Sequence, residues 1–308
     1  MTIIGARKIS YTASGALVFL SFIALLIWGL NLGIDFTGGS ILEVEWKNIR
    51  PGNDRVAEVL KLIGIEHSVL QPTEERGLIL RLPNIDEARH QELKIKLALL
   101  GEFEEKRFNA IGPTIGEELK RKSLWAMAMV LIMIVIYIAW AFRQVSKPVQ
   151  SWKYGVAAIV ALIHDVSIPT GVFAVLGYFY NVEVDALFVT ALLTILGFSV
   201  HDTIVVFDRI RENLKKMPAL TRLGGGRRAD FEGVVEQSVR DTIARSINTS
   251  LTVMIVMLML YFFGGASTKY FSLAILIGVF FGVYSSIFIA SALLVTWHKW
   301  SLKKDLRT

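Results

Sequence analysis

Long apolar stretches alternate with polar segments along this chain of 308 residues. Six stretches are long enough to cross a bilayer as helices, the form in which a single segment satisfies its own backbone hydrogen bonds in lipid. Arg7 and Lys8 precede the first stretch, as in a signal peptide, but its length and the lack of a clear cleavage site favour an anchor. The pattern predicts a polytopic α-helical membrane protein. Its spans are predicted at Ile9–Leu30, Leu124–Phe142, Tyr154–Tyr180, Ala186–Phe207, Ile247–Phe263 and Phe271–Trp297.

Basic residues gather in the short segments on one side of these spans. Nine lie between Arg209 and Arg245, and others precede the first span and follow the sixth. The positive-inside rule therefore predicts a multi-pass protein with both termini and the loop 208–246 in the cytoplasm. Most of the net charge of +6 then comes from the basic residues that set the orientation of the spans. A lipid bilayer is expected as a partner, and nucleic acid is not.

The polar segment between the first two spans, residues 34–122, has the pattern of a small extracytoplasmic domain. Residues 1–33 would hold the N-terminus and first span, and residues 123–308 the other five spans. The strand and helix patterns follow the order β-α-β-β-α-β, which is typical of a ferredoxin-like α+β domain. Asn53 or Asp54 is expected to cap the first helix, and His67 and His90 to be exposed. Strands are predicted at 40–46, 66–71, 77–82 and 102–110, and helices at 53–63 and 86–100.

Ionisable residues inside the spans are the candidate functional groups, because charge at bilayer depth is costly and marks a pathway by default. The third span carries His164 and Asp165, and the fourth His201 and Asp202. Asp202 lies six residues before Asp208 and so about 9 Å into the membrane at 1.5 Å per residue. Arg245 enters the same half from the fifth span. A carboxylate in low dielectric that exchanges a proton beside an arginine would form a proton relay.

The same residues have a plainer interpretation. Buried ion pairs and hydrogen bonds also hold membrane helices together. His164 and His201 are expected to make hydrogen bonds between helices rather than to shuttle protons. Gly278 and Gly282 form a G-x-x-x-G face for close helix packing. The chain has no cysteine, no metal-ligand set is evident, and Gly224–Gly226 lacks the ending of a phosphate loop, so no metal, cofactor or enzymatic activity is expected.

Several of these segments together resemble the SecF family of bacterial protein-export proteins, over nearly the whole chain. The match is carried by Gly33–Gly39 (G-I-D-F-T-G-G), Ala161–Val166, the long motif Gly197–Asn213 and Arg245–Ser250. The resemblance implies one half of a resistance-nodulation-division transporter, located in the inner, cytoplasmic membrane. It also implies use of the proton-motive force, with protons as the coupling ion, to help preproteins pass outward. The implied partners are SecD, the SecYEG channel, YajC and the translocating preprotein.

The resemblance also assigns roles to individual residues. The membrane aspartate and arginine of the family fall on Asp202 and Arg245. By their position alone, His201, Asp165, His164 and Thr203 are candidates for relay support. The stretch Asp35, Phe36, Thr37, Gly38 and Gly39 would lie at the outer membrane face and act structurally, as a turn and helix exit. Two departures are His201, where many relatives are expected to have Asn, and a long segment from Lys215 to Glu232.

The sequence leaves two alternative functions open. The chain could be a scaffold that stabilises SecD without carrying protons, in which case Asp202 would tolerate neutralisation while enlarging Gly278 or Gly282 would break assembly. It could also be half of a small-molecule or lipid exporter of the same superfamily. Such exporters usually carry both halves in one chain and have larger outside domains.

Overall fold

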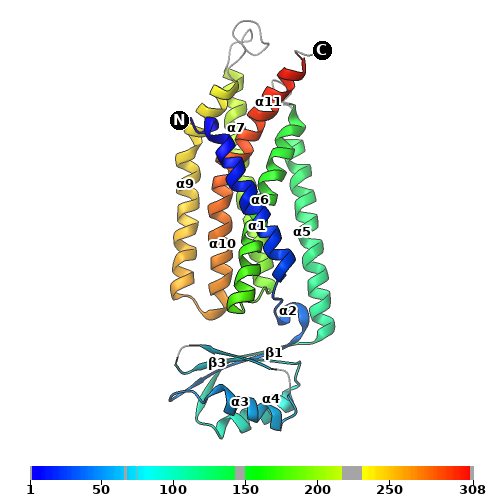
Figure 1. Ribbon diagram of the computed structural model, residues 1–308, viewed down its shortest axis with the longest axis vertical. Helices are drawn as coiled ribbons and strands as arrows, with labels where there is room; N and C mark the ends of the chain where they lie inside the picture. The colour runs from blue at the N-terminus through cyan, green and yellow to red at the C-terminus, as the bar shows by residue number, and fades with distance from the viewer. Residues whose placement is uncertain (1, 66–67, 74, 143–149, 217–230, 306–308) are drawn as a thin grey trace. The chain divides into compact units, whose positions relative to one another are not determined.

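The computed structural model describes residues 2–65, 68–73, 75–142, 150–216 and 231–305 (Figure 1). The chain forms two compact units, one made of residues 1–31 and 126–308 and the other of residues 32–125. The first is helical, and the second contains a small sheet. His67, and residues 217–230 of the long segment from Lys215 to Glu232 with its glycine run Gly224–Gly226, lie outside the described residues.

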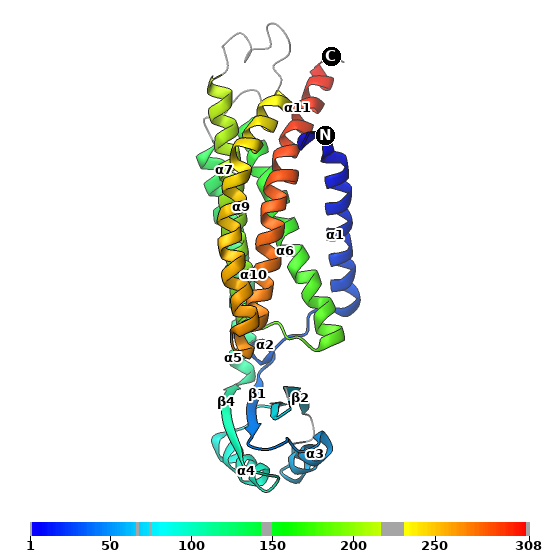
Figure 2. The same cartoon turned by 90° about the vertical axis from the view of Figure 1, so that its left-hand side faces the viewer.

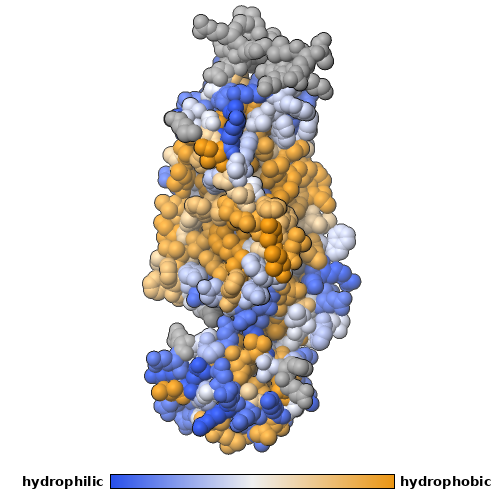
Figure 3. All heavy atoms as spheres, viewed as in Figure 1, coloured by the Kyte–Doolittle hydropathy of each residue, from blue (hydrophilic) through white to orange (hydrophobic). Residues whose placement is uncertain are grey.

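The helical unit contains six helices long and apolar enough to cross a membrane, so the predicted number of spans is confirmed for the described residues. Its apolar surface forms the orange band over these helices in Figure 3. Several helices run beyond the predicted spans. In particular, α7 and α9 continue as polar helices, and α5 begins within the sheet unit. The helices are α1 (Arg7–Trp28), α5 (Pro113–Ala141), α6 (Ser151–Tyr180), α7 (Ala186–Lys216), α9 (Phe231–Phe263), α10 (Ala266–Ser285) and α11 (Ser291–Asp305).

The sixth predicted span is not one regular helix. A π-helical turn, η2 (Ser286–Ala290), separates α10 from α11. Single π turns inside α-helices are rare and frequently occur at functional sites. α6, α7 and α10 are more buried within the unit than α5 and α9, and α1 packs against α6 (Figures 1 and 2). The buried carboxyl groups of Asp165 and Asp202, on α6 and α7, therefore lie on helices at the centre of the unit.

The start of α1, the end of α7, the start of α9 and α11 lie at the same end of the helical unit (Figures 1 and 2). Polar contacts join them there. A three-residue helix, η1 (Ile4–Ala6), begins against α9, where the Glu236 carboxylate accepts hydrogen bonds from the backbone N–H groups of Ile3 and Ile4. Glu232 forms ion pairs with Arg7 and Lys299. The N-terminus is thus tied to α9 and α11.

The sheet unit contains four antiparallel strands in the order β2-β3-β1-β4. Alternate residues of β1 and β3 point into a core shared with the two helices, and Leu42 and Leu80, paired across the strands, are both fully buried. The elements are α2 (Ile34–Thr37), β1 (Gly39–Trp46), α3 (Asn53–Leu62), β2 (Val69–Thr73), β3 (Gly77–Leu82), α4 (Glu87–Ala98) and β4 (Phe103–Ile111).

Three expectations for this unit were wrong in detail. Neither Asn53 nor Asp54 caps α3; the N-cap position is Gly52 and no side chain caps the helix. The second strand is displaced to Val69–Thr73. His90 is buried rather than exposed, because it lies on the same face of α4 as Leu93 and Leu97, and its ring stacks on Phe108. Its Nε2 lies 3.3 Å from Glu105 Oε2.

Candidate functional site

The face that α7 turns toward the centre of the bundle carries three polar side chains. Ser199, Asp202 and Thr203 are spaced by three and four residues, so they share one side of the helix, and all three are buried. The rest of the same face is apolar. This helix therefore places a carboxyl group between two hydroxyl groups inside the membrane-spanning part of the unit.

Asp165, on α6, is fully buried and surrounded by donors. Its Oδ2 accepts hydrogen bonds from Ser199 Oγ of α7 at 2.5 Å and from Ser285 Oγ of α10 at 2.7 Å. Its Oδ1 lies 2.8 Å from Nδ1 of His164, the preceding residue on the same helix. The carboxyl group thus joins three helices through one oxygen, as a structural hydrogen-bond centre would.

Asp202 has a different environment. It is 8% exposed, and the hydroxyl groups of Ser246 on α9 and Ser286 on η2 lie beside its carboxyl group. Asp202 Oδ2 and Ser246 Oγ are close enough to interact, but neither makes a hydrogen bond of regular geometry among the described residues. Ser286 Oγ is 2.9 Å from Thr203 Oγ1. A buried polar atom without a partner is costly and calls for an explanation, such as a missing group or a proton-transfer role.

The predicted pairing of Asp202 with Arg245 is absent from the described part of the chain. Arg245 is exposed and forms no ion pair there, while the next residue, Ser246, is buried toward Asp202. Neighbouring residues of a helix point in directions about 100° apart, so only one of the two can face the bundle. The inward face of α9 is instead a stripe of small polar residues, Ser238, Thr242, Ser246 and Ser250.

The two histidines also differ from expectation, since neither makes a hydrogen bond between helices in the described residues. His164 is buried and bonds only to its neighbour Asp165, and its Nε2 has no partner there. Its ring lies against the aromatic rings of Phe281 and Tyr284 on α10. His201 is exposed on the outer side of α7.

Sequence reasoning missed the serines of this site, which are Ser199, Ser246, Ser285 and Ser286. Serine is common in membrane helices, so a single one carries little information. The signal that was available is the consecutive pair Ser285–Ser286 within an otherwise apolar stretch. Because adjacent residues face different neighbours, Ser285 reaches Asp165 and Ser286 reaches Asp202 and Thr203.

Gly278 and Gly282 lie where α10 crosses α7. A Cβ atom on Gly278 would be 2.2 Å from Ile195 Cδ1, and one on Gly282 would be 3.5 Å from Ser199 Cβ. Gly278 thus allows a close approach of the two helices that no larger residue permits without rearrangement. That approach also positions Ser285 beside Asp165, two helical turns further along α10.

The stretch Asp35–Gly39 lies within the sheet unit. Asp35, Phe36 and Thr37 belong to the short helix α2, whereas α1 ends earlier, at Trp28. Gly38 and Gly39 have φ angles of 73° and 135°, in a region that favours glycine. The first turn of α5 packs directly on them. A Cβ on Gly38 would lie 2.7 Å from Pro113 Cα, and one on Gly116 would lie 2.8 Å from the Gly38 nitrogen.

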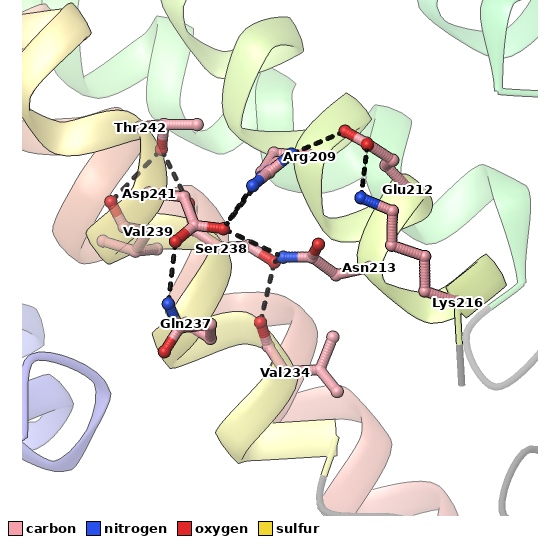
Figure 4. A network of polar contacts seen from close by, with 10 residues as sticks. All are labelled: Arg209, Glu212, Asn213, Lys216, Val234, Gln237, Ser238, Val239, Asp241 and Thr242. Carbon is pink, nitrogen blue, oxygen red and sulfur yellow. Dashed lines mark hydrogen bonds and ion pairs between the residues drawn. The ribbon is translucent and has the colours of Figure 1, made fainter. Parts of the chain in front are cut away.

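The polar continuation of α7 packs on that of α9 through the network drawn in Figure 4. Arg209 Nη2 lies 2.7 Å from Asp241 Oδ2, and Asn213 Nδ2 donates to Ser238 Oγ at 2.9 Å. Arg209 also pairs with Glu212 on its own helix. These contacts fix the α7–α9 pair at the end of the unit, so the charges here hold two helices together as well as meeting solvent.

Comparisons with known proteins match this arrangement. Residues 93–300 match the model of the family "Protein export membrane protein SecD/SecF, C-terminal", and residues 23–45 match the "SecD/SecF GG Motif". SecF of Thermobaculum terrenum is 45% identical over 94% of this chain and 92% of its own length. SecF of Synechocystis is 37% identical over 97% and 95%.

Solved structures agree with the sequence matches. The crystal structure of SecDF from Thermus thermophilus, a translocon-associated membrane protein, superposes with a TM-score of 0.81 at 32% identity. The match covers 96% of this chain but only 38% of the longer SecDF chain. A SecDF structure in a super-membrane-facing form gives a TM-score of 0.68 at 31% identity.

Six spans around a buried carboxyl layer, with these matches, define an inner-membrane transport protein of the SecD/SecF export class. Within that class the chain belongs to the SecF family of protein translocase subunits. Its relatives are named for transport and not for catalysis. The glycine pair Gly38–Gly39 lies within the segment that matches the GG motif.

Proposed function

We propose that this chain works with SecD to use the proton-motive force for preprotein translocation through the SecYEG channel. The observation that carries the proposal is the environment of Asp202. This carboxyl group is buried in a membrane-spanning helix with only serine hydroxyl groups beside it, and one of its oxygens makes no hydrogen bond of regular geometry among the described residues. It also forms no ion pair there, so it is poised to exchange a proton or to receive a group from another subunit. Protons are the coupling ion in this proposal, with no cofactor and no enzymatic step.

The partner is proposed from the polar groups that the helical unit exposes. His201 on α7 and Arg245 and Asn248 on α9 are all exposed in the single chain. A charged side chain facing lipid at that depth is costly, which favours a protein neighbour on this side. SecD fits because relatives such as SecDF of Bacillus subtilis and the solved SecDF have both names in one chain. A group from SecD would then complete the site of Asp202. YajC is proposed as a further partner on the family resemblance alone.

The sheet unit is proposed to be a ferredoxin-like domain on the outer side of the membrane. The antiparallel order β2-β3-β1-β4, with α3 and α4 between the strands in the chain, supports that assignment. The distribution of basic residues supports an outside location for it and a cytoplasmic location for both termini. In that place the domain would meet the preprotein as it leaves the channel.

The test is preprotein export by Asp202→Asn, co-expressed with SecD, with and without a proton gradient. Asp208→Asn is a matched control, since Asp208 is on the same helix and is largely exposed. We expect Asp202→Asn to lose the gradient-dependent part of export while it still co-purifies with SecD, and Asp208→Asn to keep both. If export by Asp202→Asn responded to the gradient like that of wild type, the proton role of Asp202 would be refuted. The scaffold function would then be the remaining alternative.

A further inference from the structure

Asp165 and His164 form a second buried titratable group in the helical unit. The carboxyl group of Asp165 is fully buried, and among the described residues no lysine or arginine pairs with it. The titratable groups that face the pair are few. Tyr284 of α10 packs its ring on His164, and the other contacts of Asp165 are the hydroxyl groups of Ser199 and Ser285. In the described part of the chain, His164 is therefore the only group placed to balance the carboxylate with a positive charge.

The donors and acceptors of the His164–Asp165 pair show how one proton would change its net charge. With the carboxylate ionised, Nδ1 of His164 must carry the hydrogen that faces Oδ1 at 2.8 Å, and Nε2 is then an acceptor without a donor. In that state the pair has a net charge of −1 with little solvent contact, which is costly. One further proton, on either Nε2 or the carboxyl group, makes the pair neutral.

We propose that the His164–Asp165 pair is a second proton-binding site, and that the Ser285 hydroxyl group changes its hydrogen-bond acceptor with the protonation state of this pair. The proposal rests on the proposed proton-driven function and extends it beyond Asp202. Ser285 Oγ lies 2.7 Å from Asp165 Oδ2 and 3.1 Å from the carbonyl oxygen of Gly282. A hydroxyl group has one hydrogen, so Ser285 donates to the carboxylate when Asp165 is ionised and to the helix backbone when the proton is on the carboxyl group.

The position of Ser285 gives this choice a structural consequence. Ser285 ends α10, and Ser286, which lies beside Asp202 and bonds with Thr203, begins the π turn η2. The neighbouring residues Ser285 and Ser286 therefore contact two carboxyl groups, one on α6 and one on α7. A π turn has i→i+5 hydrogen bonds in place of the α-helical i→i+4 bonds, and a return to the α-helical register is the second arrangement that the proposal assigns to η2. Proton binding at either site would bias the same segment of the sixth span.

The experiment measures proton binding and export on the complex with SecD in lipid vesicles. The variants are Asp165→Asn, Ser285→Ala and Asp202→Asn. The matched control is Ser272→Ala, because Ser272 is also fully buried on α10 but bonds only to its own helix, at the Thr268 carbonyl. Infrared difference spectra between high and low pH report the carbonyl stretch of each carboxyl group that takes up a proton, and potentiometry gives the number of protons bound.

We expect Asp165→Asn to remove one carboxyl or imidazole band and about one bound proton per chain, as a single titrating site requires. Ser285→Ala should shift that band and lower gradient-driven export at least about tenfold, since positioned proton-transfer groups contribute about 10²–10⁴-fold. Ser272→Ala should change neither. Unchanged proton binding in Asp165→Asn would overturn the second site, whatever export does. Retained gradient-driven export in Asp202→Asn would instead overturn the proposed function, so the two failures are distinguishable.

Discussion

Replacing Gly38 with alanine tests whether the glycine pair is a tight joint between α2, β1 and the first turn of α5. Gly38 has φ 73° and ψ 164°, a conformation that is nearly restricted to glycine and costs a side chain about 1–3 kcal/mol. The new Cβ would also lie 2.7 Å from Pro113 Cα and 2.9 Å from Pro113 N. Both are backbone atoms, so relief requires a shift of α5, at about 1–3 kcal/mol for overpacking.

The summed cost is about 2–6 kcal/mol, a large fraction of the 5–15 kcal/mol that usually stabilises a domain. Amide hydrogen exchange of β1 in the full chain, reconstituted in lipid, measures it. Fully buried Leu42 and Val44 in β1 are suitable probes. A loss of 2 kcal/mol speeds exchange through opening by about 30-fold, at 1.4 kcal/mol per factor of ten.

Two further variants decide whether the reasoning holds. Gly112→Ala is the control, because a Cβ there meets nothing within 4 Å and its φ is not in the positive region. Gly116→Ala clashes with the same backbone from the other side, so its effect should not add fully to that of Gly38→Ala. Exchange rates in Gly38→Ala that match those in Gly112→Ala would refute the tight joint.

Two more predictions concern other parts of the chain. Gly278→Leu should force α10 away from Ile195 and cost about 1–3 kcal/mol or more, lowering the thermal stability of the helical unit, whereas Gly197→Leu on α7, where a Cβ meets nothing within 4 Å, should not. In the sheet unit, a hydrogen bond from Lys47 at 2.6 Å lowers the pKa of Glu102. The stability from this pair is present above the ordinary pKa of a glutamate and is lost as the pH falls through the lowered one, so Lys47→Met should flatten the pH dependence of unfolding below roughly pH 5. Equal slopes for wild type and Lys47→Met would contradict that account.

The spans and the buried carboxyl groups were predictable from the sequence because each depends on a one-dimensional property. Span length and hydropathy give the number of helices, and the cost of charge in lipid marks Asp165 and Asp202 whatever their neighbours are. His90 was also accessible to such reasoning. Its spacing from Leu93 and Leu97 puts it on the buried stripe of α4, and this signal was overlooked.

The partners of the carboxyl groups were not predictable in the same way, because they depend on helix rotation. Depth estimates place Arg245 in the layer of Asp202, but a rotation of one residue turns Arg245 outward and brings Ser246 inward. The π turn adds a further change of register after Ser285 that no pattern in the sequence announces. Which serine reaches which aspartate therefore follows from packing, at Gly278 and Gly282 above all.

The contrast between the two aspartates bears on how the site works in a complex. Asp165 obtains its donors from three helices of its own chain, whereas one oxygen of Asp202 makes no hydrogen bond of regular geometry among the described residues and Arg245 is turned away on the adjacent helix. A hydrogen-bond centre that only held helices together would be expected to satisfy both groups, since an unsatisfied buried oxygen costs about 1–3 kcal/mol. Under the proposed function, a group from a neighbouring subunit would complete the environment of Asp202, so the proton site of Asp202 would form only on assembly while that of Asp165 stays within the chain. Asp202→Asn should then change proton binding only in the complex, and Asp165→Asn should change it in the isolated chain as well.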